Sequence, residues 1–267
     1  MPPLIDIGLN LTHDSFDKDR DEVLQRATDA GMVAAILTGS TVDCSRHALD
    51  LARTKPGLLF STSGVHPHHA VDCDDATIAA LREIASAPEV VAIGECGLDF
   101  FRNYSPPETQ EKWFDAQLEL AVELQMPVFL HERDAHEPFA RILQKHIANL
   151  PNAVVHCFTG SREAMGHYVS LGCHIGVTGW ICDERRGGEL QDLVKHIPLD
   201  RLLIETDAPY LLPRDIRPKP KDRRNEPVHL PHIARRIAHY MDVEFEQLAA
   251  TTTANAQQFF RLPKHGV

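Results

Sequence analysis

Short apolar runs alternate with longer amphipathic stretches from one end of this 267-residue chain to the other. Each apolar run has the length of a buried strand, and the stretches between the runs carry apolar residues at helical spacing. Eight such units in an unbroken series predict a parallel sheet, and eight strands are the number that closes a (β/α)₈ TIM barrel. The expected strands are Leu4–Leu9, Val33–Thr38, Leu58–Gly64, Val90–Gly94, Val128–Leu130, Ala153–Val155, Cys173–Val177 and Leu202–Ile204.

An open, doubly wound sheet is the main alternative to the barrel. That fold usually carries a glycine fingerprint after its first strand, but residues 6–10 read DIGLN and lack it. We therefore expect one α/β domain over residues 1–267. After the last strand, a loop rich in proline and arginine at 213–227 precedes helical patterns near 229–241, 244–250 and 253–260.

The composition excludes several classes of protein. No stretch approaches the roughly 18 apolar residues of a membrane span, and the first residues lack the basic and apolar segments of a secretion signal. The six cysteines contain no CxxC pair, which favours reduced thiols over a cysteine metal site. We expect a cytoplasmic protein without membrane contact, and a monomer because no apolar helix face lacks an explanation.

The charge is acidic overall, with one basic exception. A net charge of −11 excludes a protein that coats nucleic acid, but allows an enzyme that binds a polyanion at a local site. Residues 214–224, RDIRPKPKDRR, hold six basic and two acidic residues, so this segment carries +4 and the rest of the chain −15. Because it follows the last strand, we expect Arg214, Arg223 and Arg224 to bind substrate phosphates. The alternative is a solvated loop whose charges pair with the acidic surface.

Ionisable side chains follow the expected strands where each strand ends. Because parallel strands of a barrel point the same way, these side chains converge on one rim, the catalytic face. A buried carboxylate or imidazole is costly unless it is paired or bound to a metal. Any one of them alone is more typical of a structural residue, but together they predict a divalent-metal site of mixed nitrogen and oxygen ligands. The set comprises His66, Glu95, His131, His156, Glu205 and Asp207.

The same segments resemble the TatD family of metal-dependent deoxyribonucleases over nearly the whole chain. The matching motifs are GVHPH at 64–68, VVAIGECGLDF at 90–100, the H-x-R of 131–133, VHCFTG at 155–160, ETDAPYL at 205–211 and RRNEP at 223–227. DIGLNLT at 6–12 and GWICDERRG at 179–187 narrow the resemblance to members that act as 3′→5′ exonucleases on single-stranded DNA and RNA. The resemblance thus implies a nuclease with these substrates, and a role in repair or turnover of nucleic acid.

The resemblance also implies roles for individual residues. Glu95, His131, His156 and Asp207 would be metal ligands or groups beside the metal. Four further residues fall in matching motifs and would support metal or phosphate binding: His66, Asp99, Arg133 and Glu205.

One departure from the family pattern bears on the metal. Most of the wider family begins with D-x-H-x-H, but here Gly8 and Asn10 stand in the histidine positions, and His13 lies too far along to replace them. Losing two imidazoles favours ions that prefer oxygen. We therefore expect Mg²⁺, with Mn²⁺ and Zn²⁺ as alternatives, and expect Asn10 to orient a water or a phosphate oxygen.

The expected chemistry is phosphodiester hydrolysis, in which a metal polarises a phosphoryl oxygen and activates a water. Asp207 is the candidate general base, and Glu205 takes that role if Asp207 is only a ligand. Trp180, Phe158 and Tyr210 could stack on bases or simply pack. Two other functions stay open: a metal-dependent amidohydrolase or lactonase on the same barrel, and a non-catalytic metal-binding protein.

Overall fold

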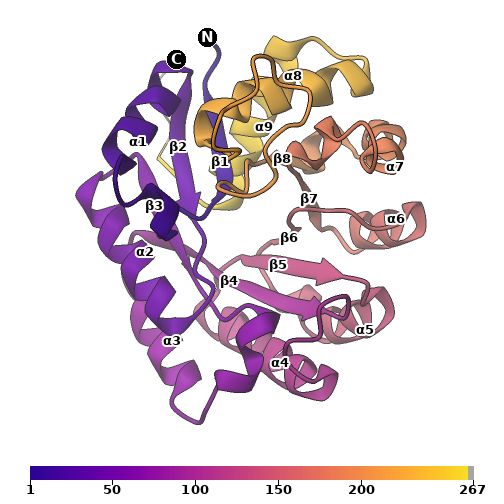
Figure 1. The fold of residues 1–267 in the computed structure, drawn as a ribbon. Coiled ribbons are helices and arrows are strands. Elements are labelled where there is room, and N and C mark those ends of the chain that lie inside the picture. The colour runs from indigo at the N-terminus through magenta and orange to yellow at the C-terminus, as the bar shows by residue number, and fades with distance from the viewer. Residues whose placement is uncertain (264–267) are drawn as a thin grey trace.

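The structure is a computed structural model and describes residues 1–263. Its eight strands form one parallel sheet in chain order, β1 to β8, around the centre of the molecule (Figure 1). The strands are β1 (Leu4–Leu9), β2 (Met32–Leu37), β3 (Leu59–Ser63), β4 (Val90–Asp99), β5 (Val128–Arg133), β6 (Ala153–Val155), β7 (His174–Val177) and β8 (Leu202–Ile204). The predicted barrel is thereby confirmed.

The first and last strands close the ring through the segment that follows β8. The Asp207 N–H donates to the Gly8 carbonyl at 2.9 Å, and the Asn10 N–H donates to the Ala208 carbonyl at 2.9 Å. These two bonds lie at the C-terminal end of β1, so the closure also draws Asn10 and Asp207 together at the rim.

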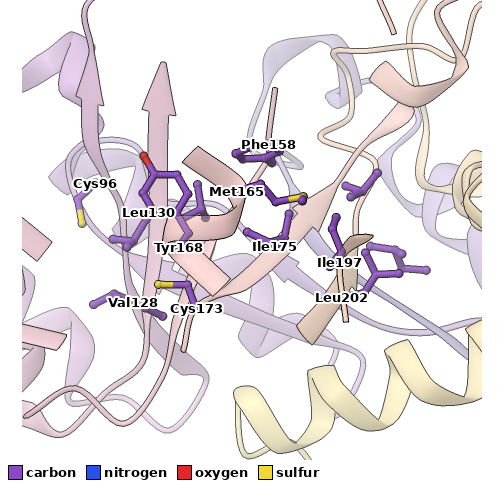
Figure 2. Packing of buried hydrophobic residues seen from close by; sticks show 14 of the residues in the cluster. Cys96, Val128, Leu130, Phe158, Met165, Tyr168, Cys173, Ile175, Ile197 and Leu202 are labelled. Atoms are coloured by element: carbon purple, nitrogen blue, oxygen red, sulfur yellow. The ribbon is translucent and has the colours of Figure 1, made fainter. Parts of the chain in front are cut away.

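Helices surround the strands (Figure 1). A large apolar cluster fills the layer between strands and helices; Figure 2 shows part of it, with Leu130, Tyr168 and Ile175 among the packed side chains. The surrounding helices are α1 (Arg20–Asp29), α2 (Val42–Thr54), α3 (Thr77–Ala85), α4 (Pro107–Leu124), α5 (His136–His146), α6 (Arg162–Ser170), α7 (Gly188–Leu193) and α8 (Leu230–Met241). None of the helices in residues 1–263 is long and apolar enough to cross a membrane.

One helix closes the bottom of the barrel. Alternate strand residues such as Ile5, Ile36 and Phe129 form an inner cluster, and Phe259 of α9 (Phe245–Phe259) packs into the same cluster. The helical patterns predicted near 244–250 and 253–260 are thus one helix. Because α9 covers the N-terminal ends of the strands, access to the barrel is from the opposite rim.

Strand β4 is five residues longer than its apolar run predicts. Gly94 and Gly97 have φ values of +137° and +147°, and a Cβ on either would collide with the carbonyl oxygen of Phe129 or His131 on β5. Only glycine allows this conformation and this approach. The pairing with β5 therefore continues to Asp99, which places Glu95 and Asp99 on one strand at the rim.

Candidate active site

A cavity of about 520 Å³ lies at the C-terminal mouth of the barrel. Its walls come from the ends of β1, β2, β3, β4, β5, β6 and β8, so it gathers residues that are far apart in the sequence. The lining residues are Asn10, Ser40, His66, His68, His69, Glu95, Arg102, Tyr104, His131, His156, Cys157, Asp207 and Tyr210. All four predicted metal ligands are among them.

One carboxylate oxygen is the centre of the cavity floor. Glu95 Oε1 lies 2.7 Å from His156 Nε2, 3.0 Å from His131 Nδ1 and 3.3 Å from His66 Nε2. Three imidazoles from three different strand ends thus point at one oxygen. The predicted convergence of these residues on one rim is confirmed.

Burial and charge set the protonation of this cluster. Burial by itself would raise the pKa of Glu95, but the imidazoles of His66 and His156 and the hydrogen bonds from His131 and His156 outweigh it, and the pKa lies well below its ordinary value. Burial opposes protonation of His156, yet Glu95 and Glu205 raise its pKa well above the ordinary value. Burial dominates at His66 and lowers its pKa to about 4.

These residues fit a divalent cation. His66, Glu95 and His131 each offer a ligand atom, and these atoms lie within 4.8 Å of one another. Imidazole nitrogen and carboxylate oxygen together suit divalent metals of the Mn²⁺ and Zn²⁺ type and also accept Mg²⁺. The cluster therefore offers nitrogen and oxygen donors close together, as a divalent cation requires.

Two further carboxylates stand behind the imidazoles. Glu205 is fully buried, accepts the Cys157 N–H at 2.6 Å, and lies 3.3 Å from His156 Nδ1. Asp99 Oδ2 lies 2.7 Å from His68 Nε2 and 3.4 Å from His131 Nε2. Neither carboxylate lines the cavity.

This position bears on the roles predicted for the two residues. Glu205 was predicted as an alternative general base and Asp99 as a substrate-binding residue, and both as supports for metal or phosphate binding. Neither carboxylate lines the cavity. Glu205 contacts His156 and Asp99 hydrogen-bonds His68, and acidic partners of this kind fix the tautomer and direction of a metal-binding histidine.

Asp207 and Asn10 form the opposite wall of the site. The Asn10 Nδ2 donates to Asp207 Oδ1 at 2.9 Å, across the seam between β1 and the end of β8. Burial raises the pKa of Asp207 to about 7, against the opposing effect of His156. Asn10, which stands in one of the two positions where most of the family has a histidine, thus fixes the Asp207 carboxylate through a hydrogen bond. His13, as predicted, does not line the cavity.

The three arginines predicted to bind phosphate have different surroundings. Arg214 and Arg223 line a second cavity of about 520 Å³, together with Arg185 and Lys219. Arg214 Nε lies 3.6 Å from both Asp183 and Glu184.

Arg224 does not belong with this cavity, which corrects the prediction for it. Its guanidinium pairs with Asp19 and with Glu226, both at 2.7 Å, and the side chain is 13% exposed. The contacts tie the loop to the start of α1. Arg224 is therefore a structural residue.

Asp215 anchors the basic loop to α8. Its two oxygens lie 2.7 Å from His232 Nε2 and 2.9 Å from Arg236 Nε. Cys182 lies close enough to form a Cys–Asp–His group with these residues, but the Arg236 guanidinium already balances the Asp215 charge. The arrangement explains how a loop of many cations keeps a defined position.

Aromatic and cationic side chains are stacked along the rim. The Arg133 guanidinium lies 5.1 Å from the ring of Phe101 and 5.8 Å from that of Trp180, and it donates to Thr159 Oγ1 at 2.8 Å. Phe158 is 2% exposed and packs inside the apolar cluster (Figure 2), so it cannot stack on a base. Tyr210 lines the cavity and is 52% exposed.

Several residues of the cavity were missed by the sequence analysis. His68 lies two residues after His66 in the GVHPH motif. It was not predicted as a site residue, because His66 lies nearer to the end of the expected strand. Arg102 and Tyr104 lie in an irregular segment beyond β4. The signal that could have found them is the GLDFFRNY run itself, in which exposed aromatic and basic residues follow a buried carboxylate.

Comparisons with known proteins agree with this geometry. The family model described as TatD related DNase matches residues 5–261. The chain is 56% identical over 260 residues to the "3′-5′ ssDNA/RNA exonuclease TatD" of Erwinia billingiae, covering 97% of this chain and 100% of that protein. It is 55% identical to the protein of the same name from Escherichia coli K12, covering 96% and 98% of the two chains. The crystal structure of YJJV, a TatD homologue from Escherichia coli, superposes with a TM-score of 0.89 at 30% identity, covering 97% and 98%. The chain belongs to the TatD related DNase family.

Proposed function

We propose that this protein is a metal-dependent nuclease that removes nucleotides from the 3′ end of single-stranded DNA and RNA. The observation that carries the proposal is the convergence of three imidazoles on Glu95 in a cavity that also holds Asp207. The names of the relatives from Erwinia billingiae and Escherichia coli support the substrates and the polarity.

Glu95, His131, His156 and Asp207 would hold the metal, with His66 beside them. Family and donor set imply a divalent ion, and we propose Mg²⁺ as the working ion. The reason is that Gly8 and Asn10 replace two imidazoles of the family pattern, leaving carboxylate and amide oxygens at that wall. Mn²⁺ and Zn²⁺ are the alternatives. When bound, the ion would polarise a phosphoryl oxygen and lower the pKa of a water.

The side chains around that position divide the remaining work. Asp207 would accept the proton of the attacking water, and Asn10 holds its carboxylate in place through the 2.9 Å hydrogen bond. Glu205 keeps His156 directed at Glu95, while Asp99 hydrogen-bonds His68 and lies 3.4 Å from His131. The barrel strands supply a rigid support, so these groups need not rearrange when the substrate arrives.

The basic cavity would bind the rest of the strand. Arg185, Lys219 and Arg223 line it together with Arg214. Because the chain outside residues 214–224 carries −15, a polyanion would be repelled from most of the surface and attracted to this basic cavity. Arg133 at the rim would add a further cation for phosphate.

We further propose that the protein works as a monomer in the cytoplasm, where six free thiols are stable. The predicted single domain of residues 1–267 includes 264–267, which lie outside the described part of the chain.

The proposed activity can be tested with end-labelled single-stranded DNA and RNA. Wild-type protein is incubated with Mg²⁺ or with EDTA, alongside a His131→Ala variant and a His47→Ala control that removes an exposed imidazole on α2. We expect shortening from the 3′ end in Mg²⁺, retained in His47→Ala and lost with EDTA or in His131→Ala. No cleavage with Mg²⁺, Mn²⁺ or Zn²⁺ would reject the nuclease and direct the search to amide and lactone substrates.

A further inference from the structure

Two tyrosines at the mouth of the active-site cavity are far more exposed than aromatic side chains usually are. Tyr104 is 63% exposed and Tyr210 is 52% exposed, and both line the cavity that contains Glu95. Tyrosine combines an apolar ring with a polar hydroxyl, and such side chains are enriched where proteins bind their partners. The proposed chemistry at Glu95 and Asp207 uses neither ring.

The tyrosines stand on opposite sides of the mouth. Tyr104 follows β4 and Tyr210 follows β8, and these strands are four places apart in a ring of eight. The cavity floor with Glu95 therefore lies between them. A strand that crosses the mouth with its phosphate over Glu95 would pass one ring on the way in and the other on the way out.

Both rings leave more than half of their surface exposed, and neither is stacked flat against a neighbour. Tyr104 meets the ring of His68 at 4.7 Å and 70°, and Tyr210 meets the ring of His13 at 5.6 Å and 89°. These contacts are edge-to-face, so no aromatic ring of the described chain lies flat on either tyrosine.

The backbone around each tyrosine is held in place. The Tyr210 N–H donates to the Asp207 carbonyl at 3.0 Å. Next to Tyr104, Ser105 Oγ donates to the His68 carbonyl at 3.0 Å and accepts the Val71 N–H at 2.9 Å. Both rings are thus presented from ordered backbone, which lowers the entropic cost of binding.

We propose that Tyr104 and Tyr210 stack on the bases of the two nucleotides that flank the scissile phosphate. This inference rests on the proposed nuclease function and adds how the single strand is gripped. Tyr210 directly precedes the segment that forms the basic cavity, lined by Leu212, Pro213 and Arg214. Tyr210 therefore holds the penultimate base, on the side of the retained strand, and Tyr104 holds the base of the departing 3′-terminal nucleotide.

This arrangement accounts for a preference for single strands without base-specific contacts. In a duplex each base is already stacked between its neighbours, so a tyrosine ring can stack on it only after it has left the duplex. Every base offers a flat face, so this stacking does not depend on the base sequence. Stacking on an aromatic side chain contributes about 1–3 kcal/mol per base, which corresponds to roughly a 5- to 150-fold change in kcat/KM.

The test pairs each tyrosine with an abasic substrate. The variants Tyr104→Leu and Tyr210→Leu remove the ring and keep apolar bulk, whereas Tyr104→Phe and Tyr210→Phe keep the ring. Single-turnover cleavage in Mg²⁺ is measured on a normal oligonucleotide, on one with an abasic 3′-terminal nucleotide, and on one with an abasic penultimate nucleotide. Far-ultraviolet circular dichroism checks that each variant is folded.

We expect both leucine variants to lose about 5- to 150-fold on the normal strand, and both phenylalanine variants to match the wild type. The loss in Tyr104→Leu should vanish when the terminal base is absent, and that in Tyr210→Leu when the penultimate base is absent. Losses that persist on both abasic strands, or leucine variants as fast as the wild type, overturn the proposal. The reverse pairing overturns the assigned direction of the strand. If wild-type protein cleaves no strand at all, the nuclease function itself fails.

Discussion

Glu205 occupies the space that a side chain on Gly8 would need. A Cβ on residue 8 would collide with Glu205 Oε2, and it would also lie 3.3 Å from the Phe129 ring. A side chain at position 8 is therefore incompatible with the position that the Glu205 carboxylate takes in this chain. The carboxylate that fills the space is the group that directs His156 at Glu95.

Replacing Gly8 by alanine should therefore destabilise the fold. The added methyl group meets a buried carboxylate and a ring within the barrel, and such overpacking costs about 1–3 kcal/mol. Urea unfolding measures the change. The matched control is Gly166→Ala in α6, where a Cβ meets nothing within 4 Å and where alanine favours the helix by about 1 kcal/mol. Equal stabilities for the two variants would contradict the role given to Gly8.

Metal binding should stabilise the folded protein. A ligand that binds only the folded state adds about 2.7 kcal/mol at a concentration 100 times its Kd. We expect the melting temperature to rise with the concentration of Mg²⁺, to fall back on adding EDTA, and to stay constant in His131→Ala. The same titration with Mn²⁺ and Zn²⁺ ranks the ions without measuring cleavage. A rise in His131→Ala as large as in the wild type would place the ion elsewhere.

Asp207→Asn should separate catalysis from metal binding. Asparagine keeps the size of the side chain but cannot accept the proton of a water, and removing a general base costs about 10²–10⁴-fold in kcat. Metal binding, followed by the rise in melting temperature, should weaken far less because Glu95, His131 and His156 remain. Equal losses in the two measurements would leave Asp207 only the role of a metal ligand and reject it as the base.

The neighbours Arg223 and Arg224 should respond oppositely to alanine. Arg224→Ala should destabilise the fold by about 1 kcal/mol, because it removes one of the two guanidinium groups that pair with Asp19 and Glu226 and leaves only Arg26 beside them. Arg223→Ala should leave stability within about 0.5 kcal/mol, raise KM for long oligonucleotides, and reduce the salt dependence of binding by about one charge. Unfolding and KM at two salt concentrations check both. A stable Arg224→Ala with a raised KM would restore its predicted phosphate role.

His174 should make the fold sensitive to acid. Burial, aided by the charge of Arg201 and opposed by Asp200, lowers its pKa to about 4 from an ordinary value of 6.5. The folded protein keeps the His174 ring neutral. The contribution of His174 to the free energy of unfolding is therefore complete above pH 6.5, and it falls between pH 6.5 and 4 because the unfolded chain takes up a proton there. The difference amounts to about 3 kcal/mol. Urea unfolding at pH 7.5 and 4.5 should show this extra loss in the wild type and not in His174→Asn.

Strand positions were predictable where the apolar run and the strand coincide. The bounds of β1, β6 and β8 agree with the prediction, because a polar residue directly follows each buried strand. The end of β4 was wrong by five residues. Its continuation depends on the approach of Gly94 and Gly97 to β5, which a sequence pattern does not contain.

The sequence by itself determined the barrel and the residues of the rim. The spacing of apolar residues is a local property, and it identifies eight strand–helix units. Because parallel strands all point the same way, the ionisable residues that follow them, Glu95, His131, His156 and Asp207, lie at the same end of the barrel. Only the tertiary structure decided which groups face the cavity. Glu205 and Asp99 lie behind the imidazoles, Arg224 pairs with Asp19 next to α1, and Tyr104 and Tyr210 lie on opposite sides of the mouth. These positions depend on contacts between segments up to about 200 residues apart. A charged side chain that is buried without a partner destabilises the fold, so each of these side chains takes the position in which it is paired.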